Sequence, residues 1–172
     1  MNVKIDVSNV KLETDRLILR PFEETDLIDF NTYAKVEGVG EMAGWPHHKS
    51  LDESKMILDR FIAGHHTFAL VHKESGKVIG SLGLEEYNEE NFKEYEKEKG
   101  LELGYVLSKD YWGEGLMPEA VRRVIKFLFE EKNLDFITCG HFVKNHQSKR
   151  VIEKCGFQLF CEGVFHGKLG QF

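Results

Sequence analysis

Apolar residues along the chain follow either the two-residue repeat of a strand or the three-to-four-residue repeat of a helix. The first pattern predicts strands at residues 16–20, 67–72, 77–86, 101–108 and 136–142, and a last extended segment at 157–165. The second predicts a first helix capped by Thr25 or Asp26, with apolar positions at Leu27, Phe30 and Ala34. It also predicts helices that span residues 51–62, 118–131 and 146–154. No internal repeat or low-complexity block interrupts this order.

The order of these elements predicts the class of fold. One strand, two helices, antiparallel strands and an alternating strand–helix tail are typical of a mixed α/β sheet covered by helices. The strand–helix–strand unit over 101–142 should cross over right-handed, which would make strands 101–108 and 136–142 parallel neighbours. The segment 88–100 is almost entirely charged and is interpreted as a solvated excursion between strands. With 172 residues, the chain is expected to form one domain over 1–172.

Composition and charge exclude several classes of protein. No apolar run approaches the roughly 18 residues that a membrane span needs, and residues 1–6 lack the apolar core of a signal peptide. The three cysteines, Cys139, Cys155 and Cys161, have no CxxC spacing, which favours reduced thiols in a cytoplasmic protein. The net charge of −6 argues against a nucleic-acid binder and is compatible with a cationic substrate.

A glycine-containing loop between strand 101–108 and helix 118–131 is the first candidate site. It contains Gly113 and Gly115, and Pro118 suits the first turn of the helix, where its missing N–H costs nothing. Such a loop presents free backbone N–H groups and the positive end of a helix, which favours a phosphate-bearing ligand. Two glycines between a strand and a helix are more often part of an ordinary turn, so this loop does not decide the function by itself.

Three segments of the chain, in order, resemble the GNAT superfamily of acetyl-CoA-dependent N-acetyltransferases. Residues 12–21 are similar to the opening strand of the branch related to ribosomal-protein N-terminal acetyltransferases. Residues 101–120 resemble the coenzyme-binding strand, pyrophosphate loop and helix, and residues 145–157 resemble the late helix with its closing Gly-Phe. The resemblance covers nearly the whole chain. It implies a mostly antiparallel mixed sheet with one splayed parallel strand pair and helices on both faces.

The resemblance also implies acetyl-CoA as cosubstrate and no metal. The pantetheine arm would enter the opening between the two parallel strands, and the pyrophosphate would lie on the loop amides. Asn145 is expected to cap the helix that follows it and can also reach the coenzyme. The residues expected to bind the coenzyme are Val106, Leu107, Trp112, Gly113, Glu114, Gly115, Leu116, Met117 and Asn145.

The sequence departs from the family pattern in three places. Met117 stands where the loop usually has a small residue, and its larger side chain would keep the loop backbone further from the coenzyme. Ile152 occupies the position of a tyrosine that protonates the departing thiolate in many members, so the usual acid is missing. The sequence ends at Phe172, where the last strand of the family would begin or run, so that strand is truncated or another segment covers the edge.

Glu102 is the candidate general base for deprotonating an amine. On a strand, Glu102, Gly104 and Val106 share one face, so a ligand has room beside this carboxylate, and partial burial would raise its pKa. A rim carboxylate without a catalytic role is the alternative. The backbone N–H of Val106 or of its neighbour would polarise the thioester carbonyl.

Ser148 is the candidate that replaces the missing acid. It shares a helical face with Val151, Ile152 and Cys155 and should therefore point inward. A serine hydroxyl can pass a proton through water. The alternative is a serine that only helps to start the helix.

Other conspicuous residues have weaker interpretations. Trp45, in the loop before the second helix, would line the acceptor pocket or only pack. Glu85 and Glu86, near the same cleft, are reserve bases, and Glu85 is also a candidate contact for the acceptor. The pairs His47-His48 and His65-His66 lack the spacing of a helical metal site.

Taken together, the sequence predicts an N-acetyltransferase that moves acetyl from acetyl-CoA directly to a primary amine. A protein N-terminus and a small cationic amine are both compatible acceptors. The alternative is a GNAT-like module that binds or senses acyl-CoA without turnover. A nucleotide- or flavin-binding protein would need its glycine loop after the first strand, whereas here the loop follows a late one. A cytoplasmic protein without nucleic-acid or membrane partners is expected, and a homodimer is compatible with this prediction.

Overall fold

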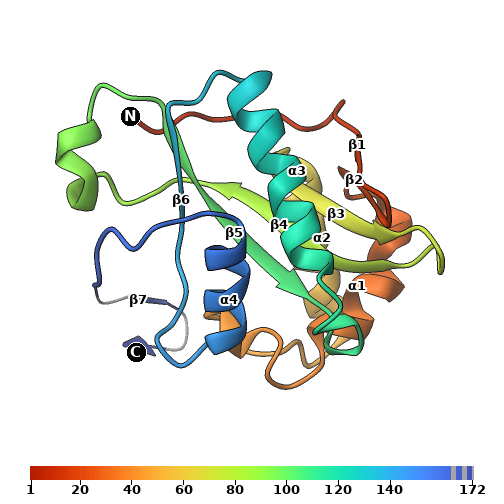
Figure 1. Ribbon diagram of the computed structural model, residues 1–172. Helices are drawn as coiled ribbons and strands as arrows, with labels where there is room; N and C mark the ends of the chain where they lie inside the picture. Colours follow the sequence, from red (N-terminus) through yellow and green to blue (C-terminus); the bar gives the residue numbers. More distant parts are fainter. Residues whose placement is uncertain (164–165, 168–169, 172) are drawn as a thin grey trace.

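The computed structural model describes residues 1–163, 166–167 and 170–171, and these form a central sheet with helices on both faces (Figure 1). The strands are β1 (Leu12–Glu13), β2 (Leu17–Pro21), β3 (Thr67–His72), β4 (Val78–Glu85), β5 (Gly100–Leu107), β6 (Phe136–Cys139), β7 (His166–Gly167) and β8 (Gly170–Gln171). The α-helices are α1 (Leu27–Ala34), α2 (Leu51–Gly64), α3 (Leu116–Glu130) and α4 (His146–Lys154). Short 3-10 turns are η1 (Glu24–Asp26), η2 (Glu41–Ala43), η3 (Glu89–Tyr95) and η4 (Lys109–Tyr111).

The main sheet runs in the order β1-β2-β3-β4-β5-β6. Successive pairs from β1 to β5 are antiparallel, and β5 with β6 is parallel. The predicted mixed sheet with a parallel pair is therefore confirmed, and so is its covering by helices. Helices α3 and α4 lie over one face, and α1 and α2 over the other (Figure 1).

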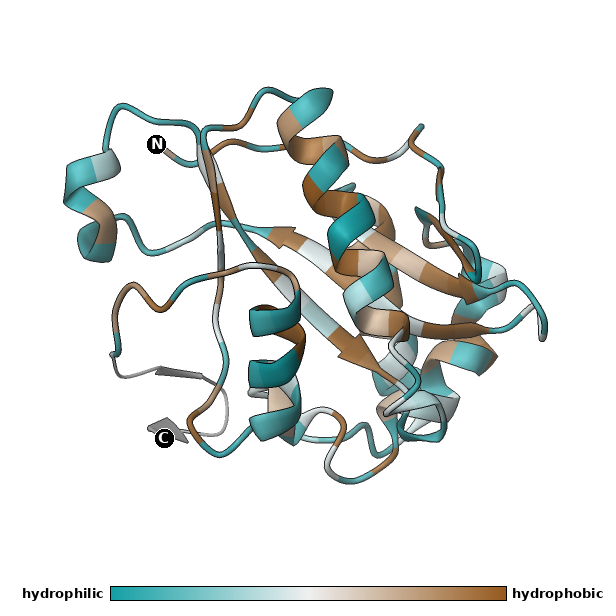
Figure 2. Ribbon diagram, viewed as in Figure 1, coloured by the Kyte–Doolittle hydropathy of each residue, from teal (hydrophilic) through white to brown (hydrophobic). Residues whose placement is uncertain are grey.

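Each face of the sheet has its own hydrophobic core. The apolar stripe of α3, which includes Val121, Val124 and Leu128, packs on Leu101 and Leu103 of β5. On the opposite face, Phe30 of α1 and its neighbours pack against α2 and the strands. Figure 2 shows the hydrophobic residues concentrated in the strands and the hydrophilic ones on the outer sides of the helices. This burial drives both helices onto the sheet.

Most elements agree with the predicted ones, and the differences lie at their ends. Helix α3 begins at Leu116, two residues before Pro118. Strand β6 ends at Cys139, so residues 140–142 are not part of a strand. The predicted extension over 157–165 is wrong for 157–163, which contain no strand, while residues 164–165 lie outside the described residues.

The start of α1 corrects the predicted role of Asp26. Its side chain makes no cap hydrogen bond at the N-terminus of α1. Instead, both carboxylate oxygens accept from the Arg20 guanidinium at 2.8 Å, and one also accepts from the backbone N–H of Glu23. Asp26 is buried, so this paired geometry compensates its carboxylate. It fixes the end of β2 to the entry of α1.

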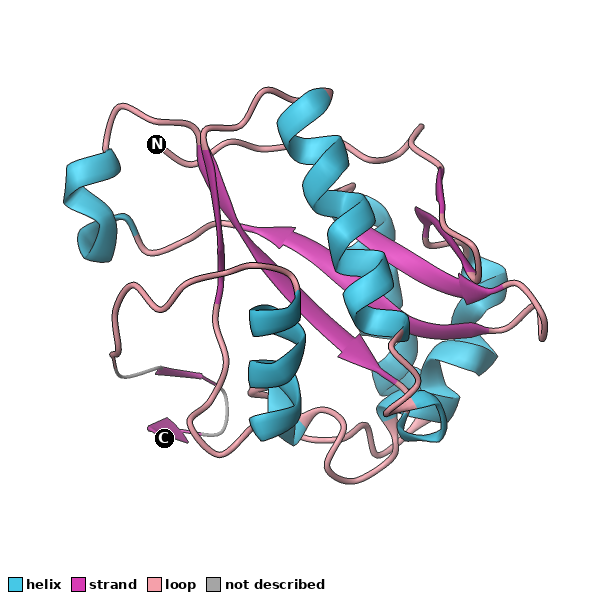
Figure 3. Cartoon of the chain, viewed as in Figure 1, coloured by secondary structure: helices cyan, strands magenta, loops and turns pink. Residues whose placement is uncertain are grey.

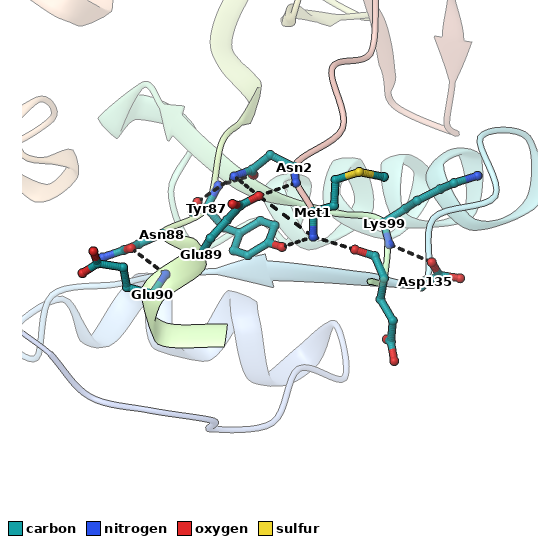
Figure 4. Close-up of polar contacts among 9 residues, drawn as sticks. Met1, Asn2, Tyr87, Asn88, Glu89, Glu90, Lys99 and Asp135 are labelled. Atoms are coloured by element: carbon teal, nitrogen blue, oxygen red, sulfur yellow. Dashed lines mark hydrogen bonds and ion pairs between the residues drawn. The ribbon is translucent and has the colours of Figure 1, made fainter. Parts of the chain in front are cut away.

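The segment before β1 is fixed to the start of β5. Asn2 forms an isolated parallel bridge with Gly100, and its side chain exchanges hydrogen bonds with the backbone of Tyr87 at 2.9 and 3.0 Å (Figure 4). The Met1 amine donates to the Tyr87 hydroxyl at 2.6 Å. These contacts support the start of β5, the strand that carries the candidate base.

The charged excursion before β5 holds more apolar contacts than its sequence predicts. Phe92 of η3 stacks on Phe160 with ring centroids 4.8 Å apart, and Tyr95 lies 5.3 Å from Phe136 of β6. Tyr87 meets Phe136 edge-on at 5.1 Å. This aromatic group anchors the excursion beside β6, so it is a packing element as well as a solvated one.

Candidate active site

Strands β5 and β6 separate part of the way along β5. Their parallel register begins at Gly100 with Phe136 and ends at Leu103 with Cys139, whereas β5 continues to Leu107. Figure 3 shows the two strands diverging from their shared start. The second half of β5 therefore has backbone groups on this side that no β6 residue pairs with. The splayed parallel pair predicted from the sequence is present.

The direction of the β5 backbone groups alternates, and this corrects the role of Val106. The Ser108 N–H donates to the Ile79 carbonyl at 2.8 Å, so residues two apart from Ser108 also turn their backbone groups toward β4. Val106 is one of them. The groups of Tyr105 and Leu107 point into the opening instead. A carbonyl in the opening would meet the N–H of one of these neighbours of Val106.

Trp112 has a positioning role at the end of β5. Its indole Nε1 donates to the Leu107 carbonyl at 2.8 Å, and its ring packs with the core on the α1 and α2 side. The Lys109 ammonium lies 5.7 Å from the same ring. Trp112 therefore uses one outward carbonyl of β5, and we assign it to holding the strand end.

The loop before α3 has the backbone shape of an anion cradle. Gly113 and Gly115 adopt φ of 80° and 77°, a region that favours glycine, and Gly115 is the N-cap of α3 without a side-chain cap. The first amides of α3, on Leu116 and Met117, therefore lack a capping side chain. The Met117 side chain is buried in the core. It points away from the cradle, so it does not obstruct approach to the backbone.

A clamp that the sequence analysis missed braces this loop. Arg16 donates to the Glu114 carbonyl at 2.9 Å, and its Nε lies 3.0 Å from Glu119 Oε1. The Thr14 hydroxyl donates to the other Glu119 oxygen at 2.6 Å. The signal was present in the family-like opening segment 12–21, but the pairing spans about a hundred residues and no local pattern reveals it.

Asn145 is confirmed as the N-cap of α4. Its Oδ1 accepts from the Ser148 N–H at 3.0 Å. Its Nδ2 donates to the Met42 carbonyl in η2 at 3.2 Å. Both ends of the amide are therefore engaged, and the residue ties α4 to the loop between α1 and α2 across the mouth of the opening. A contact with coenzyme would compete with the Met42 bond.

Glu102 lies on the same face of β5 as Val106, the face that is covered by α1 and α2. Burial, followed by the Glu85 carboxylate, raises its pKa, although Thr138 Oγ1 at 3.5 Å acts in the opposite direction. Glu85 is directly opposite Glu102 in the β4–β5 register. Two positions along the ladder, on the same face, Gly83 pairs with Gly104, so neither of these neighbours places a side chain beside the two carboxylates.

Ser148 points inward, as predicted, and meets Tyr105 from β5. The two hydroxyl oxygens are 2.8 Å apart, and Ser148 is only 9% exposed. Ile152 lies one turn further along α4 and is buried. Burial raises the pKa of Tyr105, so its phenol stays protonated at neutral pH. Burial and the Glu102 carboxylate also raise the pKa of the Cys139 thiol to about 12, which leaves it unreactive as a nucleophile.

Trp45 and the neighbouring histidines organise the loop between α1 and α2. The Trp45 ring lies against Gly40 and 5.1 Å from His48. His47 contacts Glu41 at 2.7 Å, and although burial opposes it, hydrogen bonds from His47 and Gly38 lower the pKa of Glu41 to about 2. These contacts favour the packing interpretation of Trp45. In the described part of the chain, no group of three or more His, Cys, Asp or Glu is arranged to hold a metal ion.

The acetyltransferase (GNAT) domain family matches residues 16–158. The chain belongs to this family. The uncharacterized N-acetyltransferase YoaA of Bacillus subtilis is 25% identical over 158 residues, covering 89% of this chain and 84% of YoaA. Within the described residues, no helix of this GNAT chain is both long and apolar enough to cross a membrane.

Solved structures share the GNAT fold. A GNAT-family acetyltransferase from Bacillus anthracis superposes with a TM-score of 0.76 at 22% identity, covering 91% of this chain and 87% of that one. The ribosomal-protein-S5-alanine acetyltransferase of Vibrio fischeri gives 0.66 at 22% identity, with 87% and 84% covered. The microcin C7 self-immunity acetyltransferase MccE, solved with acetyl-CoA and AMP, gives 0.71 at 17% identity, with 89% and 83% covered. The predicted GNAT resemblance is thus confirmed by the family match, and a ribosomal-protein acetyltransferase is among the structures that share the fold.

Proposed function

We propose that this GNAT chain transfers acetyl from acetyl-CoA directly to a primary amine. The observation that carries the proposal is the coincidence of three features around the second half of β5. These are the opening beside Tyr105 and Leu107, the cradle at Gly113 and Gly115, and the Glu102 carboxylate on the same strand. An acyl-CoA arm, its pyrophosphate and an amine need these three features respectively.

The backbone of the site fits acetyl-CoA. The N–H groups of Tyr105 and Leu107 and the Tyr105 carbonyl are directed into the opening, where an amide-containing pantetheine arm can pair like an added strand. The uncapped amides of Leu116 and Met117 suit the pyrophosphate. Among the predicted coenzyme contacts, Leu107 and residues 113–117 keep that role in the proposal. Val106, Trp112 and Asn145 position their neighbours instead.

The residues divide the chemistry among them. Glu102 takes a proton from the ammonium, and its raised pKa makes it a better base near neutral pH than an exposed carboxylate. A backbone N–H of Tyr105 or Leu107 polarises the thioester carbonyl as it becomes tetrahedral. The Ser148 hydroxyl donates to the departing thiolate. Glu85 adds negative charge where a cationic acceptor arrives, and Trp45 supports the loop that borders this space.

The acceptor is a protein N-terminus or a small amine, and the similarity to the ribosomal-protein-S5-alanine acetyltransferase of Vibrio fischeri supports the first of these. Binding of acyl-CoA without turnover is the second candidate function, and the buried Ile152 at the position of the usual acid favours it. A cytoplasmic location and a homodimer stay predictions.

Thiol release from acetyl-CoA tests the proposal. The purified protein is incubated with acetyl-CoA and a panel of small amines, polyamines and peptides with free N-termini, including Ala- and Ser-initiated ones. Amine-dependent release with an acetylated product is the expected result. Tight acetyl-CoA binding without release on any amine would favour the sensor, and absence of binding would reject both functions.

A further inference from the structure

Tyr105 of β5 and Ser148 of α4 are in hydrogen-bond contact at the level where β5 has separated from β6. Tyr105 lies two residues beyond the last β5–β6 pair, Leu103 with Cys139, and its side chain lies on the α3 side of the sheet. Its hydroxyl is 2.8 Å from Ser148 Oγ and 3.3 Å from the Ser148 carbonyl. One phenol thus contacts two atoms of one residue on another element, where the strands have separated.

The hydrogen-bonding capacity of these two groups defines what they can do together. A serine hydroxyl and a phenol can each donate one hydrogen bond and accept another. The Ser148 N–H is already satisfied by Asn145, which fixes the start of α4. If Tyr105 donates to Ser148 Oγ, the serine proton is left to point at a third atom. A negatively charged acceptor would strengthen both bonds in such a chain.

We propose that Tyr105 orients and polarises Ser148 so that the serine hydroxyl holds the departing coenzyme thiolate. This inference rests on the proposed coenzyme site. Tyr105 acts through Ser148 and is therefore a positioning residue. In this chain, a tyrosine on β5 compensates for the isoleucine at 152 on α4. The phenol that many family members have on the late helix is thereby supplied by β5.

The proposed step balances without further reactants. Glu102 first takes the ammonium proton and passes it to solvent. The amine nitrogen then bonds to the thioester carbon and gives its second proton to the freed Glu102 carboxylate, and the carbon–sulfur bond breaks with its electron pair on sulfur. The thiolate accepts a hydrogen bond from Ser148, which accepts one from Tyr105. Tyr105 keeps its proton throughout, in agreement with the upward shift that burial gives to its pKa. Solvent protonates the thiolate after it leaves.

The pKa of the bound coenzyme A thiol tests this inference without knowledge of the acceptor. Thiolate formation is followed by its ultraviolet absorbance against pH, with S-methyl-CoA on the same variant as the blank. The thiol pKa of free coenzyme A in the same buffer is the reference, and we expect wild-type protein to lower it by about one unit. Tyr105→Phe should lose most of this lowering, and Ser148→Ala all of it. Tyr95→Phe removes a hydroxyl on the distant η3 and should change nothing.

A double-mutant cycle separates positioning from direct contact. If Tyr105 acts through Ser148, then adding Tyr105→Phe to Ser148→Ala shifts the thiol pKa no further. A thiol pKa that is equal in wild type and Tyr105→Phe overturns the inference while leaving the coenzyme site intact. A Tyr105→Phe effect that persists in the Ser148→Ala background also overturns it, because Tyr105 then acts alone. Failure of every form, wild type included, to bind coenzyme A rejects the proposed function as well.

Discussion

Glu102 on β5 lies directly opposite Glu85 on β4, two residue pairs away from the paired glycines at 83 and 104. Burial raises the pKa of Glu102, and the like charge of Glu85 opposite it adds to this upward shift. Glu85 is exposed and has His66 Nε2 at 3.6 Å. The pair combines a basic carboxylate with a second one that attracts a cation.

Glu102→Gln should lower turnover by about 10²- to 10⁴-fold, because the amine loses its proton acceptor, while the affinity for acetyl-CoA changes little. Wild-type activity should rise as pH passes through the raised pKa of Glu102, since only the carboxylate accepts a proton. Steady-state kinetics against pH, with calorimetric titration of acetyl-CoA, measure both. A variant with the wild-type pH–rate profile would clear Glu102 of this role.

The same substitution has a consequence for stability. The native state holds the Glu102 proton to higher pH than the unfolded chain, so wild-type stability falls as pH rises above the ordinary glutamate value of 4.5. Glutamine has no charge to lose. Glu102→Gln should therefore melt at a higher temperature than wild type at pH 8, and the difference should vanish near pH 4. Equal melting temperatures at pH 8 would contradict the raised pKa.

Glu85→Gln should shift the acidic limb of the pH–rate profile to lower pH by about half a unit, because Glu102 loses a like charge. Glu86→Gln is the matched control. Glu86 is the next residue, forms an exposed ion pair with Lys4 at 3.4 Å, and lies outside the Glu102 pair. The two profiles should differ. Identical shifts in both variants would attribute the effect to net charge alone.

Gly104→Val should raise the KM for the amine by about tenfold or more and leave acetyl-CoA affinity within about twofold. A Cβ at this position meets only Glu85 Cγ at 3.8 Å, so the valine fits the strand and fills the space beside Glu102. Gly104→Ala should have a smaller effect in the same direction. Initial-rate kinetics with either substrate varied give both constants. An unchanged amine KM would place the acceptor elsewhere.

Trp112→Phe should weaken acetyl-CoA binding about fivefold. The variant loses the hydrogen bond from the indole to the Leu107 carbonyl, worth about 0.5–1.5 kcal/mol, and so loosens the strand end that the coenzyme pairs with. Trp45→Phe changes the chain's other tryptophan, which packs in the loop between α1 and α2, and should leave this affinity unchanged. Equal affinities for wild type and Trp112→Phe would show that the strand end does not depend on the indole.

The sequence predicted the elements that local patterns specify. The stripe of Val121, Val124 and Leu128 sets helix α3, and Asn145 caps α4 as expected. Glu102 could be assigned to the face of Gly104 because side chains alternate along a strand. The ends of the helices and strands were less predictable. Strand β6 ends at Cys139 because β5 and β6 diverge there, and this depends on packing that no local pattern encodes.

Features that depend on pairing across the chain could not be predicted. The backbone N–H and C=O of Val106 point toward β4 because of the pairing register between β4 and β5. A register shifted by one residue would turn them into the opening. The Tyr105–Ser148 contact joins β5 to α4, and the Arg16–Glu119 clamp joins the region before β2 to α3. Asp26 looked like a helix cap, but the nearby Arg20 guanidinium is a stronger partner for a buried carboxylate.

The affinity for acetyl-CoA of a matched pair of variants at Gly113 tests the central claim most directly. Asparagine and aspartate are similar in size and both tolerate positive φ, and a Cβ at Gly113 meets nothing within 4 Å. They differ in one negative charge. Calorimetric titration should show Gly113→Asn binding acetyl-CoA within about fivefold of wild type and Gly113→Asp at least tenfold more weakly than Gly113→Asn, because the carboxylate repels the pyrophosphate. Equal affinities in the two variants would contradict the account of this loop as the pyrophosphate cradle.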